Sequence, residues 1–347
     1  MIKRLSVKNY KSLRDIELEF GKVTALIGPN NSGKSNVLDC LAFLAESCRK
    51  PINNAFFARG EYPCLVFGGL EKDIEIEIDF SLGGECQYYM RFGKQGIGEE
   101  RLVVSGETRI ERDQSRSAIR SDGGWQDGST NAYESTLYAF GANEHFSEAK
   151  KIRDYVSSWR LYHFSSAEEM RSPVEVKREY DLEKSGRNLI RVLISLRNAY
   201  PGVFDQVEEA VRQGVPEIEN LLTPLTPEGA AYLAVREQGF EQEFGCHQLS
   251  DGTLKFLGCV TAAALPWPHL VCFEDLENSI HLRLLQLLIE FLHRSDRQSV
   301  FSTHLPYITN FVQPEDIRVV EKKQGETQIR RVDQLYVLRD TLRIILS

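Results

Sequence analysis

The sequence contains no run of about 20 consecutive apolar residues, the length that a membrane-spanning helix requires. Its N-terminus alternates apolar and polar residues as a strand does, and so differs from a secretory signal. None of its seven cysteines belongs to a C-x-x-C pair, which argues against a zinc site or a disulfide framework. These absences predict a protein of the reducing cytoplasm that has no membrane partner.

A surplus of positive charge is also missing. The chain has 42 lysines and arginines against 50 acidic residues, a net charge of −8, so nucleic-acid binding would require a local basic patch. Two clusters qualify, but acidic residues interrupt both, which favours a solvated face. Their members are Arg109, Arg112, Arg116 and Arg120, and Lys322, Lys323, Arg330 and Arg331.

Long heptad stretches and internal repeats are absent as well. The composition that remains, 42% hydrophobic and 27% charged over 347 residues, is that of a soluble globular protein with a sizeable core. This length fits two or three domains, or one large α/β domain that carries an insertion.

Hydrophobic periodicity predicts the secondary structure. The first part of the chain is expected to contain strands at 2–7, 15–20 and 22–28, a helix at 35–46, further strands at 73–80, 85–92 and 100–112, and an exposed loop at 110–131. The second part is expected to be helical over 145–222, with a strand at 230–238, a helix over 249–265, a strand at 269–275, a helix at 282–293 and a strand at 298–304. The alternation of strand and helix in this last region predicts a parallel sheet.

The segment GPNNSGKS, residues 28–35, follows an apolar strand and opens a helix. It matches G-x-x-x-x-G-K-[ST] at every fixed position, and this context is what a phosphate-binding P-loop requires. Glycines allow successive backbone N–H groups to face the phosphate oxygens, and the helix N-terminus adds its positive dipole end. Lys34 is then expected to reach the β- and γ-phosphates and Ser35 to coordinate Mg²⁺.

Two adjacent acids, Glu274 and Asp275, end the apolar strand HLVCFED. Neighbouring carboxylates repel each other, and a metal ion relieves that repulsion. An ATPase needs such acids beside its P-loop to hold Mg²⁺ and to activate water. The alternative is an acidic strand end that caps the next helix through its dipole.

Two further polar segments accompany these motifs. His304 ends the next strand, VFSTH, and is expected near the same phosphates. The segment LSDGT, residues 249–253, precedes an apolar helix. Ser250 reads as an N-cap, and Gly252 at an exposed helix N-terminus also suits an anion.

In order, these four elements resemble the ABC-type ATPase heads of the RecF/SMC/OLD class, and most closely the short bacterial OLD-like proteins described as predicted AAA-family ATPases. LSDGT resembles the ABC signature, FEDLENSIH the E-E-P-E-N-G-L-H segment, and STHLP the T-T-H-S-P segment. The resemblance implies an α/β fold, a mixed central sheet with an antiparallel β-lobe, and a helical lobe inserted before the signature. The expected divisions are 1–145, 146–245 and 246–347.

The resemblance also assigns roles. Glu274 stands at the position of the Walker B metal acid, Asp275 at that of the catalytic glutamate, and His304 at that of the switch histidine. Glu277 is assigned to the following loop and not to the metal. The expected nucleotide contacts are Gly28, Asn30, Asn31, Ser32, Gly33, Lys34, Ser35 and Asn36, with Lys11 as a further candidate and Ser250 and Gly252 from the signature. No Q-loop can be placed.

Asp275 departs from the family pattern because aspartate is one methylene shorter than glutamate. A general base must come within about 2.6–3.2 Å of the proton that it takes. Either hydrolysis is slow and the ATP-bound state persists, or a backbone shift restores the reach.

In such heads the signature acts in trans, so the resemblance implies a homodimer that closes on ATP and Mg²⁺. The chain ends about 43 residues after His304, too few for a Toprim nuclease domain, so we expect a separately encoded effector, plausibly a nuclease in bacterial anti-phage defence. The alternatives are a RecF-like DNA-binding repair ATPase, an ATP clamp with little turnover, and, least favoured, a transporter subunit.

Overall fold

The computed structural model describes residues 1–347 except 70–71, 114–115, 122, 129–130 and 332–347. It forms two compact units, one of residues 1–160 with the chain from Gln313 onward, the other of residues 161–312. These units differ from the three divisions expected from the sequence, which remain a prediction about the lobes of the ATPase.

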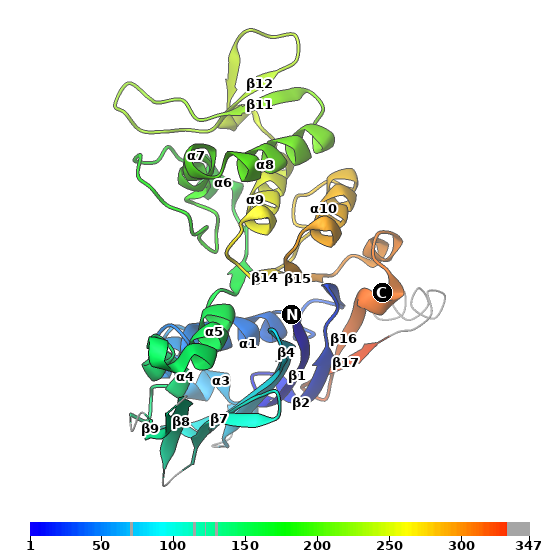
Figure 1. The fold of residues 1–347 in the computed structure, drawn as a ribbon. Coiled ribbons are helices and arrows are strands. Elements are labelled where there is room, and N and C mark those ends of the chain that lie inside the picture. Colours follow the sequence, from blue (N-terminus) through cyan, green and yellow to red (C-terminus); the bar gives the residue numbers. More distant parts are fainter. Residues whose placement is uncertain (70–71, 114–115, 122, 129–130, 332–347) are drawn as a thin grey trace. The chain divides into compact units, whose positions relative to one another are not determined.

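An antiparallel sheet in the first unit has the strand order β2-β1-β4-β5-β6-β7-β8-β9 (Figure 1). Its alternating residues form one apolar face; in β4 Ile74, Ile76, Ile78 and Phe80 are all buried, as period-2 strands dictate. The strands are β1 (Ile2–Tyr10), β2 (Leu13–Glu19), β4 (Ile74–Ser81), β5 (Glu85–Gly93), β6 (Gly96–Val104), β7 (Glu107–Arg112), β8 (Ser117–Ser121) and β9 (Gly124–Asp127).

The loop expected at 110–131 was wrong, because β8 and β9 form a hairpin there. Ile119 pairs with Ile110 of β7 and is fully buried. The hairpin depends on this cross-strand contact, which the short, Gly- and Ser-rich segment itself does not reveal.

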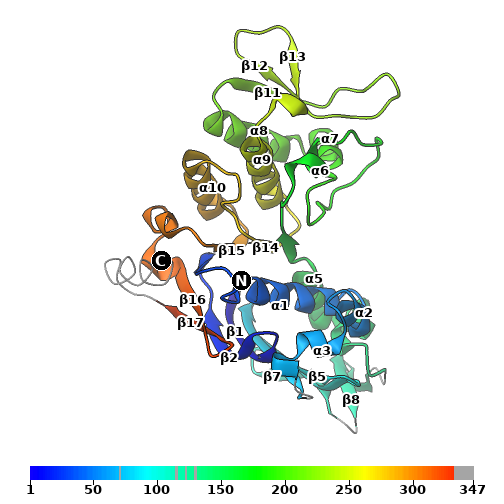
Figure 2. The same ribbon diagram turned by 180° about the vertical axis from the view of Figure 1, so that it is seen from behind.

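The nucleotide loop follows β3 (Val23–Ile27), which is buried at every residue. Strand β16 (Ile317–Lys323) pairs parallel with β3 and antiparallel with β17 (Glu326–Arg331). Helix α1 (Lys34–Ser47) packs against the antiparallel sheet through Phe43, whose ring stacks on Phe92 at 4.9 Å, and lies beside α5 (Figure 2). The other helices of this unit are α2 (Ile52–Phe57), α3 (Tyr62–Leu65), α4 (Thr136–Phe140), α5 (Ser147–Ser157), η1 (Phe67–Gly69), η2 (Glu144–Phe146) and η5 (Pro314–Asp316).

The second unit contains the parallel pair β14 (Leu270–Phe273) and β15 (Gln298–Thr303), with β10 (Arg160–Tyr162) on the other side of β14. Helix α9 (Asp251–Ala264) is buried along nearly all its length and packs against α8 (Pro201–Gly214) and α10 (Leu282–Arg294). The remaining elements are α6 (Ala167–Arg171), α7 (Leu189–Ala199), η3 (Cys246–Gln248), η4 (Pro306–Asn310), and the strands β11 (Ile218–Leu222), β12 (Ala234–Glu237) and β13 (Glu243–Gly245), which form a small antiparallel sheet.

Helices dominate residues 145–222, as expected, and two short strands, β10 and β11, also lie within this stretch. Both strands are short, and a strand of three to five residues shows too few alternations to be separated from a helix by period alone. The parallel strands and helices predicted from 249 onward are confirmed.

Every cysteine lies in the described part of the chain and is a free thiol, as the absent C-x-x-C spacing predicted. Burial raises the pKa of the Cys48 thiol to about 12, and the pKa values of Cys40, Cys259 and Cys272 rise for the same reason. Within the described residues, no helix has both the length and the apolar character needed to cross a membrane.

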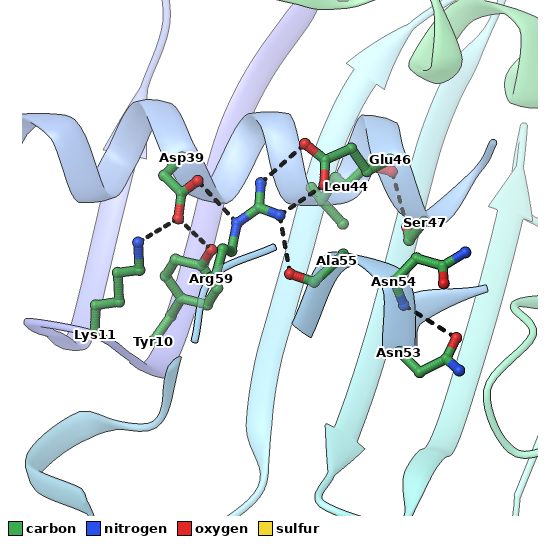
Figure 3. A network of polar contacts seen from close by, with 10 residues as sticks. All are labelled: Tyr10, Lys11, Asp39, Leu44, Glu46, Ser47, Asn53, Asn54, Ala55 and Arg59. Atoms are coloured by element: carbon green, nitrogen blue, oxygen red, sulfur yellow. Dashed lines mark hydrogen bonds and ion pairs between the residues drawn. The ribbon is translucent and has the colours of Figure 1, made fainter. Parts of the chain in front are cut away.

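A partly buried ionic network fixes α1 in its unit (Figure 3). The carboxylate of Asp39 accepts hydrogen bonds from Tyr10 Oη at 2.7 Å and Arg59 Nε at 2.8 Å, and pairs with Lys11 Nζ at 2.6 Å. Arg59 also pairs with Glu46, about two helical turns further along the same face of α1, at 2.6 Å. Burial alone would raise the pKa of Asp39, but Arg59 and Lys11 outweigh it and hold the pKa below its ordinary value.

We predict that Asp39→Asn lowers the free energy of unfolding at neutral pH by about 2 kcal/mol. This loss is smaller than the ~3–5 kcal/mol expected when one partner of a buried ion pair is removed, because Arg59 still pairs with Glu46. A carboxyl group with a depressed folded-state pKa stabilises fully above its unfolded pKa of about 3.9 and loses that contribution as the pH falls through the folded value. The difference between wild type and variant should therefore shrink only below about pH 4.

Urea unfolding over a pH series measures this difference. Glu75→Gln, which removes an exposed partner of Lys8, is the control and should change stability little. A difference between wild type and Asp39→Asn that is constant from neutral to acid pH would contradict the role given to Asp39.

Candidate ATPase site

The P-loop lies between β3 and α1, as the sequence predicted. Gly33 has a φ of 107° at the N-cap, and no side chain caps the helix. A helix N-terminus without a side-chain cap can direct backbone N–H groups at a phosphate.

Two glycines of this loop have no room for a side chain. A Cβ on Gly28 would lie 2.0 Å from the carbonyl oxygen of Val320 in β16. A Cβ on Gly33 would lie 2.0 Å from Thr327 Oγ1 and 2.9 Å from Ser12 Oγ. The glycines that the motif requires are therefore also required by the packing of the loop against β16 and β17.

Polar side chains support the loop from this side. Thr327 Oγ1 donates to the carbonyl oxygen of Ser32 at 2.9 Å and lies 2.6 Å from Ser12 Oγ. Asn36, expected at the nucleotide, donates to Ser12 Oγ at 2.6 Å. Sequence reasoning missed Ser12 and Thr327, since they are 315 residues apart and neither belongs to a motif.

The two predicted lysines differ in their surroundings. Lys34 is buried, and its ammonium donates to the carbonyl oxygens of Gly28 and Pro29, both at 2.8 Å, so it is held over the loop. Lys11 is paired with Asp39, which supports a structural role for it. Ser35, by contrast, is exposed.

Asn30 and Asn31, at the tip of the loop, are exposed, and Asn31 has a φ of 64°. Ser32 is 1% exposed, and its hydroxyl has no hydrogen-bond partner among the described residues. A buried hydroxyl without a partner is costly, so Ser32 Oγ is suited to take up a ligand atom.

Glu274 immediately follows β14 in the second unit, and its neighbour strand holds it. Its carboxylate Oε2 lies 2.9 Å from His163 Nδ1, and its backbone N–H donates to the carbonyl oxygen of Tyr162 at 2.9 Å. The hydrogen bond to Glu274 raises the pKa of His163 against the opposing effect of burial. His163 was missed because it follows a three-residue strand that no periodicity marks.

Asp275 has a φ of 48°, in the left-handed region that aspartate tolerates better than most residues. Its N–H donates to Ser302 Oγ at 2.9 Å, and the N–H of Leu276 donates to the carbonyl oxygen of Ser302 at 3.0 Å. The end of β15 thus fixes the backbone turn that directs the Asp275 carboxylate.

Glu277 supports the predicted switch histidine. It is 6% exposed, and its Oε1 accepts the backbone N–H of His304 at 2.7 Å. Nδ1 of His304 lies 2.7 Å from the same oxygen without the alignment of a hydrogen bond. Glu277, assigned from the sequence to the loop, is therefore the residue that ties this loop to the end of β15.

The signature segment caps α9. Ser250 Oγ accepts the N–H of Thr253 at 3.1 Å, so Ser250 is an N-cap, as its residue type predicted. A Cβ on Gly252 would lie 2.4 Å from the carbonyl oxygen of Ser279. Lys255, one turn further along, is buried, and its ammonium lies 3.4 Å from Ser279 Oγ. The signature helix is thus packed directly on the loop that follows the two acids.

Glu274, Asp275 and Lys255 line one narrow cavity of about 10 Å³. Two neighbouring carboxylates raise the free energy of their common charged state, and a nearby cation lowers it. Lys255 therefore brings a positive charge to the lining of the cavity that the two acids share.

Most members of the two basic clusters make internal contacts. Arg109 and Arg120 pair with Glu107, and Arg112 donates to backbone carbonyl oxygens. In the second cluster, Lys323, Arg330 and Arg331 pair with glutamates. Lys322 donates to the amide oxygen of Asn31. These contacts favour the solvated face over a nucleic-acid surface.

Among the described residues, no group of three or more His, Cys, Asp and Glu side chains could hold a metal ion. Mg²⁺ does not require one, because it is usually bound by one or two protein oxygens together with substrate phosphates. The exposed hydroxyl of Ser35 and the carboxylate of Glu274 are hard oxygen donors of this kind.

A protein-family model described as "AAA domain, putative AbiEii toxin, Type IV TA system" matches residues 23–310. The chain belongs to this family. The matched residues include the P-loop, the signature segment, both strand-end acids and His304.

Curated proteins show the same relationship. An ATP/GTP phosphatase of Helicobacter pylori is 20% identical over 84% of this chain and 80% of its own length. An OLD nuclease of Thermus scotoductus is 53% identical over 38 residues, 11% of this chain, and a RecF protein of Phocaeicola vulgatus is 42% identical over 57 residues, 16% of this chain. These last two matches span only 7% and 15% of those proteins.

Solved structures share the fold. An SMC head bound to the C-winged helix domain of ScpA has a TM-score of 0.61 at 15% identity, over 97% of this chain and 99% of that chain. The SMC head domain of Thermotoga maritima has a TM-score of 0.54 at 17% identity, over 96% and 99%. The chain is an ATPase head of the ABC type and of the RecF/SMC/OLD class, as the four motifs predicted.

We predict that Gly252→Ala destabilises the second unit by about 1–3 kcal/mol, because the added methyl group collides with the backbone of Ser279. Thermal unfolding measures the change. Gly202→Ala is the matched control: nothing lies within 4 Å of its Cβ, and alanine in a helix is neutral to stabilising. Equal midpoints for the two variants would show that the close approach at Gly252 is unimportant.

Proposed function

We propose that this protein is an ATP-dependent switch whose two protomers close on ATP. The observation that carries the proposal is the P-loop, with its uncapped helix N-terminus and its glycines packed against β16 and β17. The P-loop, the signature segment, the two strand-end acids and the switch histidine, in the expected order, support the same reading.

Within one protomer, the backbone N–H groups from Gly28 to Ser35 bind the phosphates, and Lys34 leaves the loop carbonyls for the β- and γ-phosphates. Ser35 and Glu274 would hold Mg²⁺, which would supply positive charge to the phosphate oxygens. His163 keeps the Glu274 carboxylate in one orientation, because the hydrogen bond between them fixes its Oε2.

Asp275 is the proposed base. It takes a proton from the attacking water as the water oxygen bonds to the γ-phosphorus, and the bond from that phosphorus to the bridging oxygen of ADP breaks. The left-handed backbone at Asp275, held by Ser302, changes the direction of a short side chain. We propose that this partly restores its reach and that turnover is slow.

The signature acts on the partner's nucleotide. Ser250 and Gly252 at the N-terminus of α9 close over the γ-phosphate, and His304 contacts the γ-phosphate held in its own protomer. Neither P-loop nor signature alone satisfies the charge of the triphosphate, so ATP favours the homodimer over the free protomers.

The switch controls a separate effector, which we propose is a nuclease in anti-phage defence. The OLD nuclease match and the toxin–antitoxin wording of the family description support this assignment. The second candidate is a RecF-like DNA-binding ATPase, favoured by the match to RecF. DNA affinity that falls steeply with salt would select the second candidate.

Lys34→Ala is expected to weaken ATP binding by about tenfold or more, because a charge-assisted contact to the phosphates is lost, and to abolish ATP-dependent dimerisation. Light scattering with and without ATP and Mg²⁺ measures the mass. Lys22→Ala, an exposed lysine before β3, is the control and should behave as wild type. Dimerisation that occurs without ATP and that Lys34→Ala does not weaken would refute the ATP-closed dimer.

Asp275→Ala should reduce the ATPase rate by about 10²–10⁴-fold, the usual contribution of a general base, while ATP binding is retained. Asp275→Glu should be at least as fast as wild type, because it restores the reach of the family's glutamate. An unchanged rate in Asp275→Ala would remove Asp275 as the base, and no rate in wild type would leave an ATP clamp.

A further inference from the structure

The guanidinium group of Arg171 binds the turn that precedes the signature helix α9. Arg171, the last residue of α6, has a side chain that is 12% exposed. Its Nη2 donates to the carbonyl oxygen of Leu249 at 2.9 Å and to Asp251 Oδ1 at 2.7 Å, and its Nε donates to the carbonyl oxygen of Cys246 at 3.3 Å. These three acceptors span the whole turn that leads into α9.

Arg171 and Cys246 each donate a hydrogen bond to the backbone of the other. Cys246 Sγ donates to the carbonyl oxygen of Arg171 at 3.2 Å, so the side chain of Cys246 binds the backbone of α6 in addition to the contacts of the guanidinium. Arginine presents donors in a rigid planar fork, whereas lysine is a single point charge on a flexible stem. Only arginine can therefore satisfy two carbonyl groups and a carboxylate from one position.

We propose that Arg171 is the positioning residue of the signature motif. It holds residues 246–251 so that Ser250 and the N-terminus of α9 meet the nucleotide of the partner protomer. This inference rests on the proposed function, because it concerns how the ATP-closed dimer forms. The Arg171 contacts given above all lie within the second unit, so we expect that loading of a single protomer with ATP does not depend on it.

The segment that carries Arg171 also touches the metal acid. It begins at His163, bonded to Glu274 at 2.9 Å, and ends at Arg171. Residues 163–171 thus contact Glu274 at one end and the signature turn at the other. A change in the position of Glu274 would therefore reach the signature turn through this segment and the hydrogen bonds at its two ends.

The test compares Arg171→Ala and Arg171→Lys with Arg187→Ala, whose guanidinium is 68% exposed and paired with Glu183. Affinity for a fluorescent ATP analogue is measured on dilute protein, and ATP-dependent dimerisation by analytical ultracentrifugation. Arg171→Ala should keep ATP affinity within about twofold and weaken dimerisation by about tenfold or more, as expected when a buried charged hydrogen-bond donor is lost. Arg171→Lys should fall between Arg171→Ala and wild type, and Arg187→Ala should match wild type.

The possible failures are distinguishable. Wild type that does not dimerise with ATP would refute the proposed function. Wild type that dimerises while Arg171→Ala does so equally well would refute only the role of Arg171, and an equal loss of ATP affinity and dimerisation in a folded Arg171→Lys would show a general structural effect instead. Should Arg171→Ala not fold, the comparison of Arg171→Lys with Arg187→Ala decides between these results.

Discussion

The absence of a side chain at Gly33 is the constraint on which the nucleotide loop depends. Its φ of 107° turns the chain from β3 into α1, and the hydroxyl of Thr327 would lie 2.0 Å from any Cβ there. The same hydroxyl donates to the carbonyl oxygen of Ser32, so one contact both requires the glycine and fixes the loop. Strand β17, near the end of the described chain, therefore determines the shape of a motif that ends at residue 35.

A similar arrangement holds the acids of the second unit. Glu274 is fixed from β10 through His163, Asp275 from β15 through Ser302, and His304 from the loop through Glu277. Each residue that the chemistry needs is oriented by a residue on a neighbouring strand or loop. Side chains that are held before the ligand arrives cost less ordering when it binds.

Much of the fold and of the motif set could be predicted from the sequence, because both depend on local order. The P-loop, the strand-end acids and the N-cap Ser250 are recognisable from residues within a few positions of one another. The hairpin β8–β9, the strand β10 and the supporting residues Ser12, His163 and Arg171 could not be predicted in this way. Their roles arise from contacts across distant segments, which a single sequence does not display.

We propose that the catalytic site is completed by two protomers. The dependence of the ATPase rate per protomer on protein concentration tests this proposal. At saturating ATP and Mg²⁺, the rate per protomer should rise with protein concentration and reach a plateau when the dimer is complete, as mass action requires. A rate per protomer that stays constant from nanomolar to micromolar protein, in a sample that is monomeric throughout, would show that one protomer hydrolyses ATP without a partner.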